Sequence, residues 1–331
     1  MRPIVLATLT ILVACAQDQK IHRASNREVF YQEPTDMVDI LWVIDNSKSM
    51  ADNQAKIAER FASFMIGLED SGSDFHIGVI TTDLDDYKNA ALLQGVPAIL
   101  TNDTPDYTEK FQDKVQVGVE GSDMEEGIDA AYRAVSEPMV SGANAGFRRE
   151  GATLMINYVS DEDDCSDRGA LYGSDFARPC YQDAGRLVPV KDLIDDYEVL
   201  RATGERFLVS AIVGPKMSAD HPDCGEWRPG SRYNTMAKAY GGIEGNICEQ
   251  DFESIMSDLG LQVGGVLTSF VLQDYAVVDS IEVWVDEHRV PRSETDGWTY
   301  EEEYKIVYFY GDGIPPRGSE IAIEYEVGAP G

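Results

Sequence analysis

The sequence predicts an α/β protein with a doubly wound, mainly parallel sheet, followed by a small all-β domain. Two observations support this fold class. Through residues 38–261, apolar runs alternate with amphipathic helical segments, the pattern of a parallel sheet covered by helices on both faces. From Val266 onward the helical pattern stops, and short apolar segments are separated by turns such as Asp296-Gly297, which indicates antiparallel strands.

The first 35 residues are predicted to be a targeting segment and a tether. A short apolar run behind a positively charged start cannot span a bilayer stably, and it ends Leu12-Val13-Ala14-Cys15. This ending resembles a bacterial lipobox. Residues 1–15 would then be a lipoprotein signal peptide, with Cys15 lipidated, and the polar residues 16–35 would be a tether. The alternative is an ordinary secretory signal cut near Ala14 or Ala16.

The first predicted strand leads directly into the candidate site. The apolar run Ile40–Ile44 stops at Asp45, and Ser47 and Ser49 follow before a helical pattern begins. Ligands bind at the carboxyl ends of strands in such sheets. One carboxylate and two hydroxyls suit a hard divalent cation, Mg²⁺ first and Mn²⁺ or Ca²⁺ as alternatives. They neutralise the ion only in part, so it would attract one more anionic oxygen.

Asp45, Ser47 and Ser49 after a hydrophobic strand resemble the metal-ion-dependent adhesion site of von Willebrand factor A domains. The resemblance covers roughly residues 36–265. It implies a fourth ligand, usually Thr, before a later helix, and an Asp after the fourth strand that holds a metal-bound water. Ser122, ahead of a helix predicted over residues 124–135, and Asp161 occupy these places. Ser122 also stands three residues before a Glu, as in a capping box.

Two further carboxylate pairs follow predicted strands at the same edge. Asp83 and Asp85 come after the strand at 75–82, and Asp163 and Asp164 come after the strand at 153–159. Either pair could support a second cation such as Ca²⁺, because clustered carboxylates repel one another when no cation is present. The alternative is that each pair faces water in a solvated loop. The residues between, 88–117, are predicted to be loop with short strands.

Four cysteines remain after Cys15, an even number that implies disulfides in an exported protein. Three pairings are open, and neighbours in sequence are the simplest choice: Cys165–Cys180 and Cys224–Cys248. These pairs lie in two insertions, 165–190 and 214–248, each of which follows a strand. Both insertions should therefore lie above the edge that carries the candidate site.

Residues 266–331 are predicted to form a β-sandwich-like domain packed on the first. Its expected strands are residues 270–272, 280–285, 305–310 and 321–325. An adhesion-type domain with loop cysteines and a C-terminal β unit resembles lipoproteins of predatory and social bacteria related to myxobacteria.

The charge and the motifs exclude several function classes. A net charge of -32 would be repelled by the phosphate backbone, which argues against nucleic-acid binding. The four histidines, His22, His76, His221 and His288, show no zinc or nucleophile spacing, and no Gly-x-Ser-x-Gly elbow or phosphate-binding glycine loop occurs. The sequence therefore predicts that the chain is not an enzyme; a metal-assisted hydrolase would need a general base that is not in evidence.

The leading expectation is a binding protein anchored by lipid in a bacterial cell envelope, the outer membrane being favoured over the inner. Its metal would capture an acidic group of a protein or surface-polymer partner, whose carboxylate completes the coordination. The alternative is a structural envelope lipoprotein in which any ion only stabilises loops.

Overall fold

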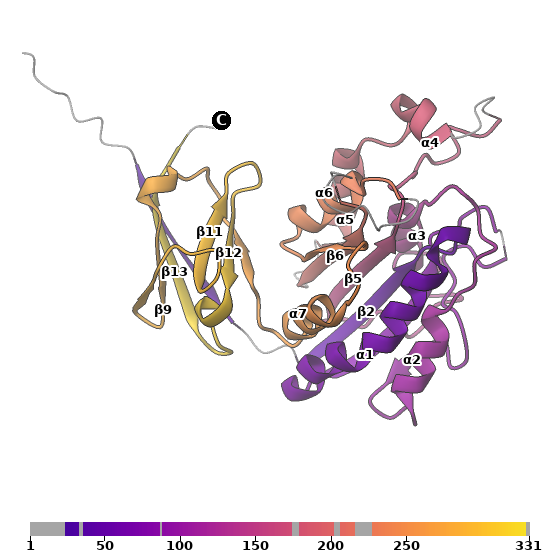
Figure 1. The fold of residues 1–331 in the computed structure, drawn as a ribbon, viewed down its shortest axis with the longest axis horizontal. Coiled ribbons are helices and arrows are strands. Elements are labelled where there is room, and N and C mark those ends of the chain that lie inside the picture. The colour runs from indigo at the N-terminus through magenta and orange to yellow at the C-terminus, as the bar shows by residue number, and fades with distance from the viewer. Residues whose placement is uncertain are drawn as a thin grey trace, which may run out of the picture.

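A computed structural model describes residues 24–32, 36–86, 88–173, 179–201, 206–215 and 227–328. They form two units (Figure 1): an α/β unit with a central sheet, and a β unit beside it. Among these residues no helix is long and apolar enough to cross a membrane. The predicted signal peptide, with Cys15, lies outside them.

A six-stranded sheet forms the centre of the α/β unit, in the order β4-β3-β2-β5-β6-β7. All neighbouring strands are parallel except β4, which is antiparallel to β3. The predicted doubly wound, mainly parallel sheet is therefore confirmed. The strands are β2 (Met37–Ile44), β3 (Asp74–Thr81), β4 (Leu100–Thr101), β5 (Thr153–Ser160), β6 (Phe207–Val213) and β7 (Glu244–Asn246).

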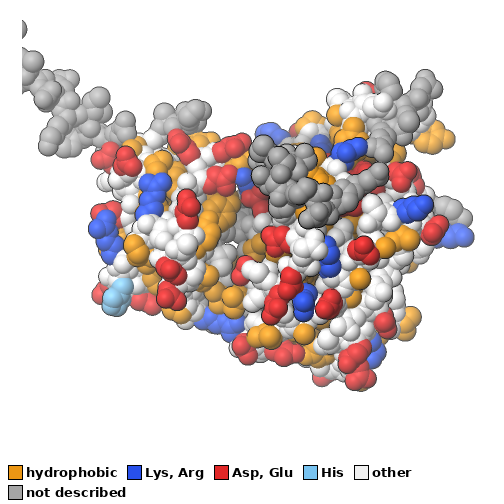
Figure 2. All heavy atoms as spheres, in the orientation of Figure 1, with side chains coloured by type: hydrophobic (Ala, Val, Ile, Leu, Met, Phe, Trp, Pro, Cys, Tyr) orange, Lys and Arg blue, Asp and Glu red, His pale blue; other side chains and the backbone are white. Residues whose placement is uncertain are grey.

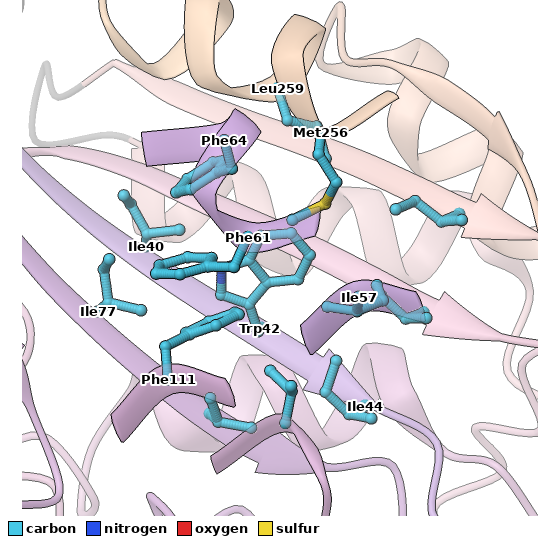
Figure 3. Close-up of a cluster of buried hydrophobic side chains, with 14 of the residues drawn as sticks. Ile40, Trp42, Ile44, Ile57, Phe61, Phe64, Ile77, Phe111, Met256 and Leu259 are labelled. Atoms are coloured by element: carbon cyan, nitrogen blue, oxygen red, sulfur yellow. The ribbon is translucent and has the colours of Figure 1, made fainter. Parts of the chain in front are cut away.

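Helices cover both faces of this sheet because its strands are apolar on both sides. Alternate residues of β2 enter opposite cores: Trp42 packs toward α1, α2 and α7, and Val43 packs toward α3, α5 and α6. Figure 3 shows the first core, where Trp42 lies among Phe61, Phe64 and Phe111. The α-helices are α1 (Ala51–Ser71), α2 (Tyr107–Val115), α3 (Gly127–Ala134), α4 (Pro179–Gln182), α5 (Val190–Arg201), α6 (Ser231–Ala239) and α7 (Glu253–Val263).

Two antiparallel sheets form the β unit, in the orders β1-β13-β9-β10 and β11-β12-β8. Apolar side chains from both sheets, Phe270 and Ile323 among them, form its core. The predicted small all-β unit is thus confirmed. Its strands are β1 (Ser25–Tyr31), β8 (Ser269–Val271), β9 (Glu282–Val285), β10 (His288–Val290), β11 (Gly297–Glu301), β12 (Ile306–Tyr310) and β13 (Glu320–Glu326).

The predicted tether is wrong for the residues of β1. Ser25–Tyr31 pairs along its whole length with β13, so the β unit is built from both ends of the described chain. The backbone hydrogen bonds to β13 order these seven residues, and their polar composition gives no sign of such a distant partner. The first eight residues of the predicted tether, 16–23, and its last three, 33–35, lie outside the described residues.

Three other local predictions are corrected. The segment 88–117 contains α2, whose Phe111 and Val115 are buried. The second insertion contains α6 and the short parallel strand β7. The helix predicted from residue 124 begins only at Gly127. Short elements with few apolar positions give weak periodic signals, and tertiary packing decides their structure.

Polar contacts join the two units. The Arg317 guanidinium of the β unit donates to the carbonyl oxygens of Asp70 and Gly67 at the end of α1, at 2.9 and 3.1 Å. The Lys238 ammonium on α6 lies 2.6 Å from the Glu301 carboxylate on β11. The β unit therefore contacts the helical layers of the α/β unit.

Candidate metal centre

The site residues come together because β2, β3 and β5 are parallel and end in register. Ile44 is paired with Thr81 on one side and with Val159 on the other. The loops that begin at Asp45, Thr82 and Asp161 therefore start side by side at the carboxyl edge of the sheet. This is the edge where a doubly wound fold binds ligands.

Asp45 is completely buried at this edge. One carboxyl oxygen accepts the Ser47 backbone N–H at 2.6 Å, and the other accepts the Ser160 hydroxyl at 2.6 Å. Burial raises the pKa of Asp45 to about 6, although the hydrogen bonds from Ser160 and Ser47 oppose that rise. Burial disfavours the charged form of a carboxyl, so this ionised group would be stabilised by a cation.

Ser47, Ser49 and Asp161 lie beside Asp45, as predicted. The two hydroxyl oxygens are 3.3 Å apart, and the Ser49 hydroxyl donates to Asp161 at 3.1 Å. Burial raises the pKa of Asp161 to about 7, with Asp45 as the next cause. Four of the five predicted site residues are thus close together at the carboxyl edge of the sheet.

Ser122, the fifth predicted residue, binds elsewhere. Its hydroxyl donates to Asp85 at 2.9 Å, its backbone N–H donates to Asp83 at 3.1 Å, and its oxygen accepts the Met124 N–H at 3.1 Å. The capping-box interpretation is wrong as well, because α3 begins at Gly127 with Glu126 as its N-cap residue. Ser122 therefore belongs to the loop that holds Asp83 and Asp85.

Glu125 lies where the missing ligand is expected, and sequence reasoning overlooked it. Its side chain is 1% exposed, and its Oε1 has no hydrogen-bond partner. Burial raises the pKa of Glu125 to about 10, followed by the negative charges of Asp45 and Glu162. The signal in the sequence is position: Glu125 stands just before α3, where the family resemblance implies a ligand.

Glu162 and two side chains from the insertions form the rim of the site. Tyr181 follows Cys180 in the first insertion. Its hydroxyl donates to Glu162 at 3.1 Å and accepts the Asp163 N–H at 3.3 Å. The Arg228 N–H, from the second insertion, donates to the Asp161 carbonyl at 2.7 Å. Its guanidinium lies 5.8 Å from the centre of the Tyr181 ring. Both insertions therefore reach the candidate site, as the sequence predicts.

The other two carboxylate pairs have partners from the protein. Asp83 accepts the backbone N–H groups of Asp85 and Asp86 at 2.8 and 3.1 Å. Asp164 accepts the Arg232 guanidinium at 3.0 Å, and Asp163 accepts the Arg232 backbone N–H at 2.8 Å. With the Ser122 hydroxyl that donates to Asp85, these contacts give each of the four side chains a partner, through turns and an ion pair, the pattern of ordered loops.

The structure confirms the Cys165–Cys180 disulfide, which closes the first insertion. Cys248 is also disulfide-bonded. Its predicted partner, Cys224, lies outside the described residues.

The donors at the edge fit a hard divalent cation. Asp45 and Glu125 offer carboxylates, and Ser47 and Ser49 offer hydroxyls, all of them hard oxygen ligands. In the part of the chain that the structure describes, no three Asp, Glu, His or Cys side chains converge to hold an ion by themselves, so the serine hydroxyls would be required. The unpartnered Oε1 of Glu125 is the atom that such an ion would satisfy.

No protein-family model matches this chain, and no curated protein is similar to it in sequence. Among solved structures, it is similar to the pilus adhesin SpaC from Lactobacillus rhamnosus GG in its open conformation. That match has 12% identity and a TM-score of 0.44, and covers 91% of this chain and 40% of the adhesin. The human COPII-coat protein Sec24c is also similar, with 11% identity, a TM-score of 0.39, and coverage of 96% and 44%. The chain spans less than half the length of either protein.

Proposed function

We propose that this chain is a divalent-metal-dependent binding protein of the von Willebrand factor A type. Asp45, Ser47, Ser49 and Glu125 would hold the ion, and Asp161 would hold a water bound to it. The ion, Mg²⁺, Mn²⁺ or Ca²⁺, would keep a coordination position for an oxygen of a protein or surface-polymer partner. The resemblance of the ending Leu12–Cys15 to a lipobox supports attachment to a bacterial envelope.

One observation supports the proposal most strongly: two buried carboxyl groups lie at the carboxyl edge of the sheet, and no basic side chain of the described residues balances their charge. Asp45 and Glu125 are buried, and neither forms an ion pair with a basic side chain of the described residues. Each raises the energy of ionising the other. Isolated buried charge is costly, and paired or metal-bound charge is the usual remedy.

Calorimetric titration of Mg²⁺, Ca²⁺ and Mn²⁺ into chelator-stripped protein tests this proposal. We expect one site in the wild type and none in Asp45→Ala. The Arg149→Lys variant is the control, because Arg149 lies at the opposite edge of the sheet. Equal binding by wild type and Asp45→Ala would reject the site and favour the structural alternative, in which ions only stabilise loops.

A further inference from the structure

One strand of the β unit has an edge that no described strand covers. β1 (Ser25–Tyr31) is the outermost strand of its sheet, and its seven residues pair one-to-one with β13, without a bulge. Hydrogen bonds at both ends show which backbone groups face β13: the Ala24 carbonyl accepts the Val327 N–H, and the Gln32 N–H donates to the Ser319 carbonyl. Because this direction alternates along a strand, the residues of odd number in β1 direct their N–H and C=O groups away from the sheet.

β1 also lacks the features that usually protect an edge strand. Natural sheets keep edge strands short, or place Pro, Lys or a bulge on them, and so prevent pairing with another chain. β1 has none of these, and its odd positions expose Val29 and Tyr31, at 38% and 55%. The other edge of the sheet, β10, is three residues long, and the Trp298 indole N–H donates to its Val290 carbonyl at 3.0 Å. The edge at β1 is therefore open, whereas the edge at β10 is short and covered.

Exposed carboxylates surround the open edge. The Arg27 guanidinium, the exposed basic group of β1, is already bound to Glu324 on β13 at 3.1 Å. Glu320 and Glu326 on β13, and Asp274, which lies against β1, are also exposed and form no ion pair within the described residues. A strand added to β1 would lie about 10 Å from β13, two strand spacings, so long basic side chains could approach these carboxylates. Charge complementarity therefore favours a basic partner, whereas a second copy of this chain, at -32, would be repelled.

We propose that β1 is the docking edge for an extended, basic segment of a partner protein. The segment would add a strand to the sheet through the outward backbone groups of Val29 and Tyr31. An apolar side chain of the segment would cover Val29. Basic side chains at the two ends of the paired stretch would lie near Glu320 and Glu326. This edge is separate from the proposed metal centre, and the docking requires no ion.

The test titrates the peptide Lys-Thr-Val-Thr-Thr-Thr-Lys, capped at both ends, into the protein in the presence of chelator. Amide NMR follows the backbone signals of β1, which we expect to shift until the peptide saturates. One control peptide has Glu in place of both Lys, and another has the same side chains with N-methylated backbone amides. Both should bind at least about tenfold more weakly, because the first reverses the charge and the second removes the hydrogen-bond donors.

Val29→Pro and Val29→Thr form a matched pair of variants. Val29 directs its N–H away from β13, so proline removes an outward donor without breaking a bond to β13. Threonine keeps the donor and the branched side chain. Peptide affinity should fall by about tenfold or more in Val29→Pro and should change by less than about twofold in Val29→Thr. In the wild type, bound peptide should also slow hydrogen exchange of the Tyr31 amide, which tests the pairing without a substitution.

The outcomes separate this inference from the metal centre. Equal binding of the Glu peptide, of the N-methylated peptide or by Val29→Pro would overturn it, as would a Tyr31 amide that bound peptide leaves unprotected or β1 signals that no peptide shifts. A dimer of the protein alone that Val29→Pro abolishes in sedimentation would assign the edge to a second copy and overturn the basic partner. Peptide binding that needs a divalent ion, or is lost in Asp45→Ala, would place the peptide at the metal centre instead. Failure of the metal titration would leave the edge intact, because the peptide is expected to bind in chelator.

Discussion

The two ends of the central strand β2 each carry a buried carboxylate, and the two carboxylates differ in their partners. Asp39, near its start, is completely buried and lies 2.7 Å from the Arg149 guanidinium, with His76 at 3.9 Å. Asp45, just after its end, is equally buried and has only hydroxyl and N–H donors. Arg149 therefore balances the buried charge at the amino end of β2, whereas Asp45, at the carboxyl end, forms no ion pair with a basic side chain of the described residues. Asp39 is thus part of a structural ion pair, and the absence of such a partner at Asp45 is what supports the proposed metal centre.

The electrostatics of the two carboxyls reflect that difference. Burial raises the pKa of Asp39, but the hydrogen bonds and positive charge of Arg149 oppose the rise. For Asp45 only hydrogen bonds oppose it, and Glu162 adds to it. Figure 2 shows acidic side chains spread over both units on the face in view, so negative charge is general in this protein. The unusual feature of the carboxyl edge is that Asp45 and Glu125 are buried without a basic partner among the described residues, whereas the equally buried Asp39 has Arg149.

The largest change in stability is expected when the positive charge at the amino end of β2 is removed. Arg149→Met should lower the free energy of unfolding by about 3–5 kcal/mol, because Asp39 would stay buried without its partner. Chemical denaturation with and without Mg²⁺ measures it, and the loss should be the same in both. Asp39→Asn combined with Arg149→Met should lose clearly less. A loss below about 1 kcal/mol in the single variant would contradict the structural role of this pair.

The corresponding experiment at the carboxyl end adds a cation. A divalent ion at one hundred times its Kd should raise the free energy of unfolding by about 2.7 kcal/mol, provided that it binds only the folded state. The same denaturation series measures it. The increase should persist in Arg149→Met and vanish in Asp45→Ala. An increase that survives in Asp45→Ala would place the ion elsewhere.

The metal-free protein should lose stability as pH rises from about 4 to about 7. The pKa values of Asp45 and Asp161 are raised to about 6 and about 7 in the folded protein, so the folded state binds more protons than the unfolded state, whose carboxyls titrate near 4. Stability then falls with rising pH through this window. Denaturation at successive pH values in chelator measures the slope.

Two additions sharpen the pH experiment. In the folded protein the pKa of Glu125 is raised to about 10, so Glu125 must take up a proton on folding near neutral pH. Glu125→Gln avoids this cost because the amide does not ionise, and the variant should therefore be more stable than wild type in chelator. A saturating divalent ion should reduce the loss of stability with pH, because it favours the ionised carboxylates. A metal-free protein whose stability rises steadily from pH 4 to pH 7 would contradict the account of the carboxyl edge.

The smallest expected effect concerns a single hydroxyl. Ser49→Ala should weaken cation binding by about tenfold, since it removes one neutral ligand and leaves both inner carboxylates in place. Calorimetric titration measures the change, and Ser122→Ala is the matched control. Ser122 binds Asp85 rather than the centre, so its loss should leave cation affinity unchanged. Equal weakening in the two variants would return Ser122 to the ligand set.

Sequence reasoning predicted the elements whose signals are local and strong. Apolar runs such as Ile40–Ile44 identified the central strands, and the abrupt stop at Asp45 marked the candidate site. It missed what depends on distant partners. Ser25–Tyr31 is a strand only because β13 lies beside it. Ser122 and Glu125 are three positions apart, and the spacing alone could not decide which side chain enters the centre. The proposal of Glu125 rests on its burial and on the hydrogen bonds of Ser122 to Asp83 and Asp85, which only the structure reveals.

The most direct test of the account is a crystal structure of the protein with Mn²⁺, located by its anomalous scattering. The account predicts one peak bounded by Asp45, Ser47, Ser49 and Glu125, with Asp161 contacting a bound water. It also predicts no peak beside Asp39, where Arg149 already balances the charge. An ion bound by Ser122 instead of Glu125, or a carboxyl edge that stays empty at saturating Mn²⁺, would contradict the central claim.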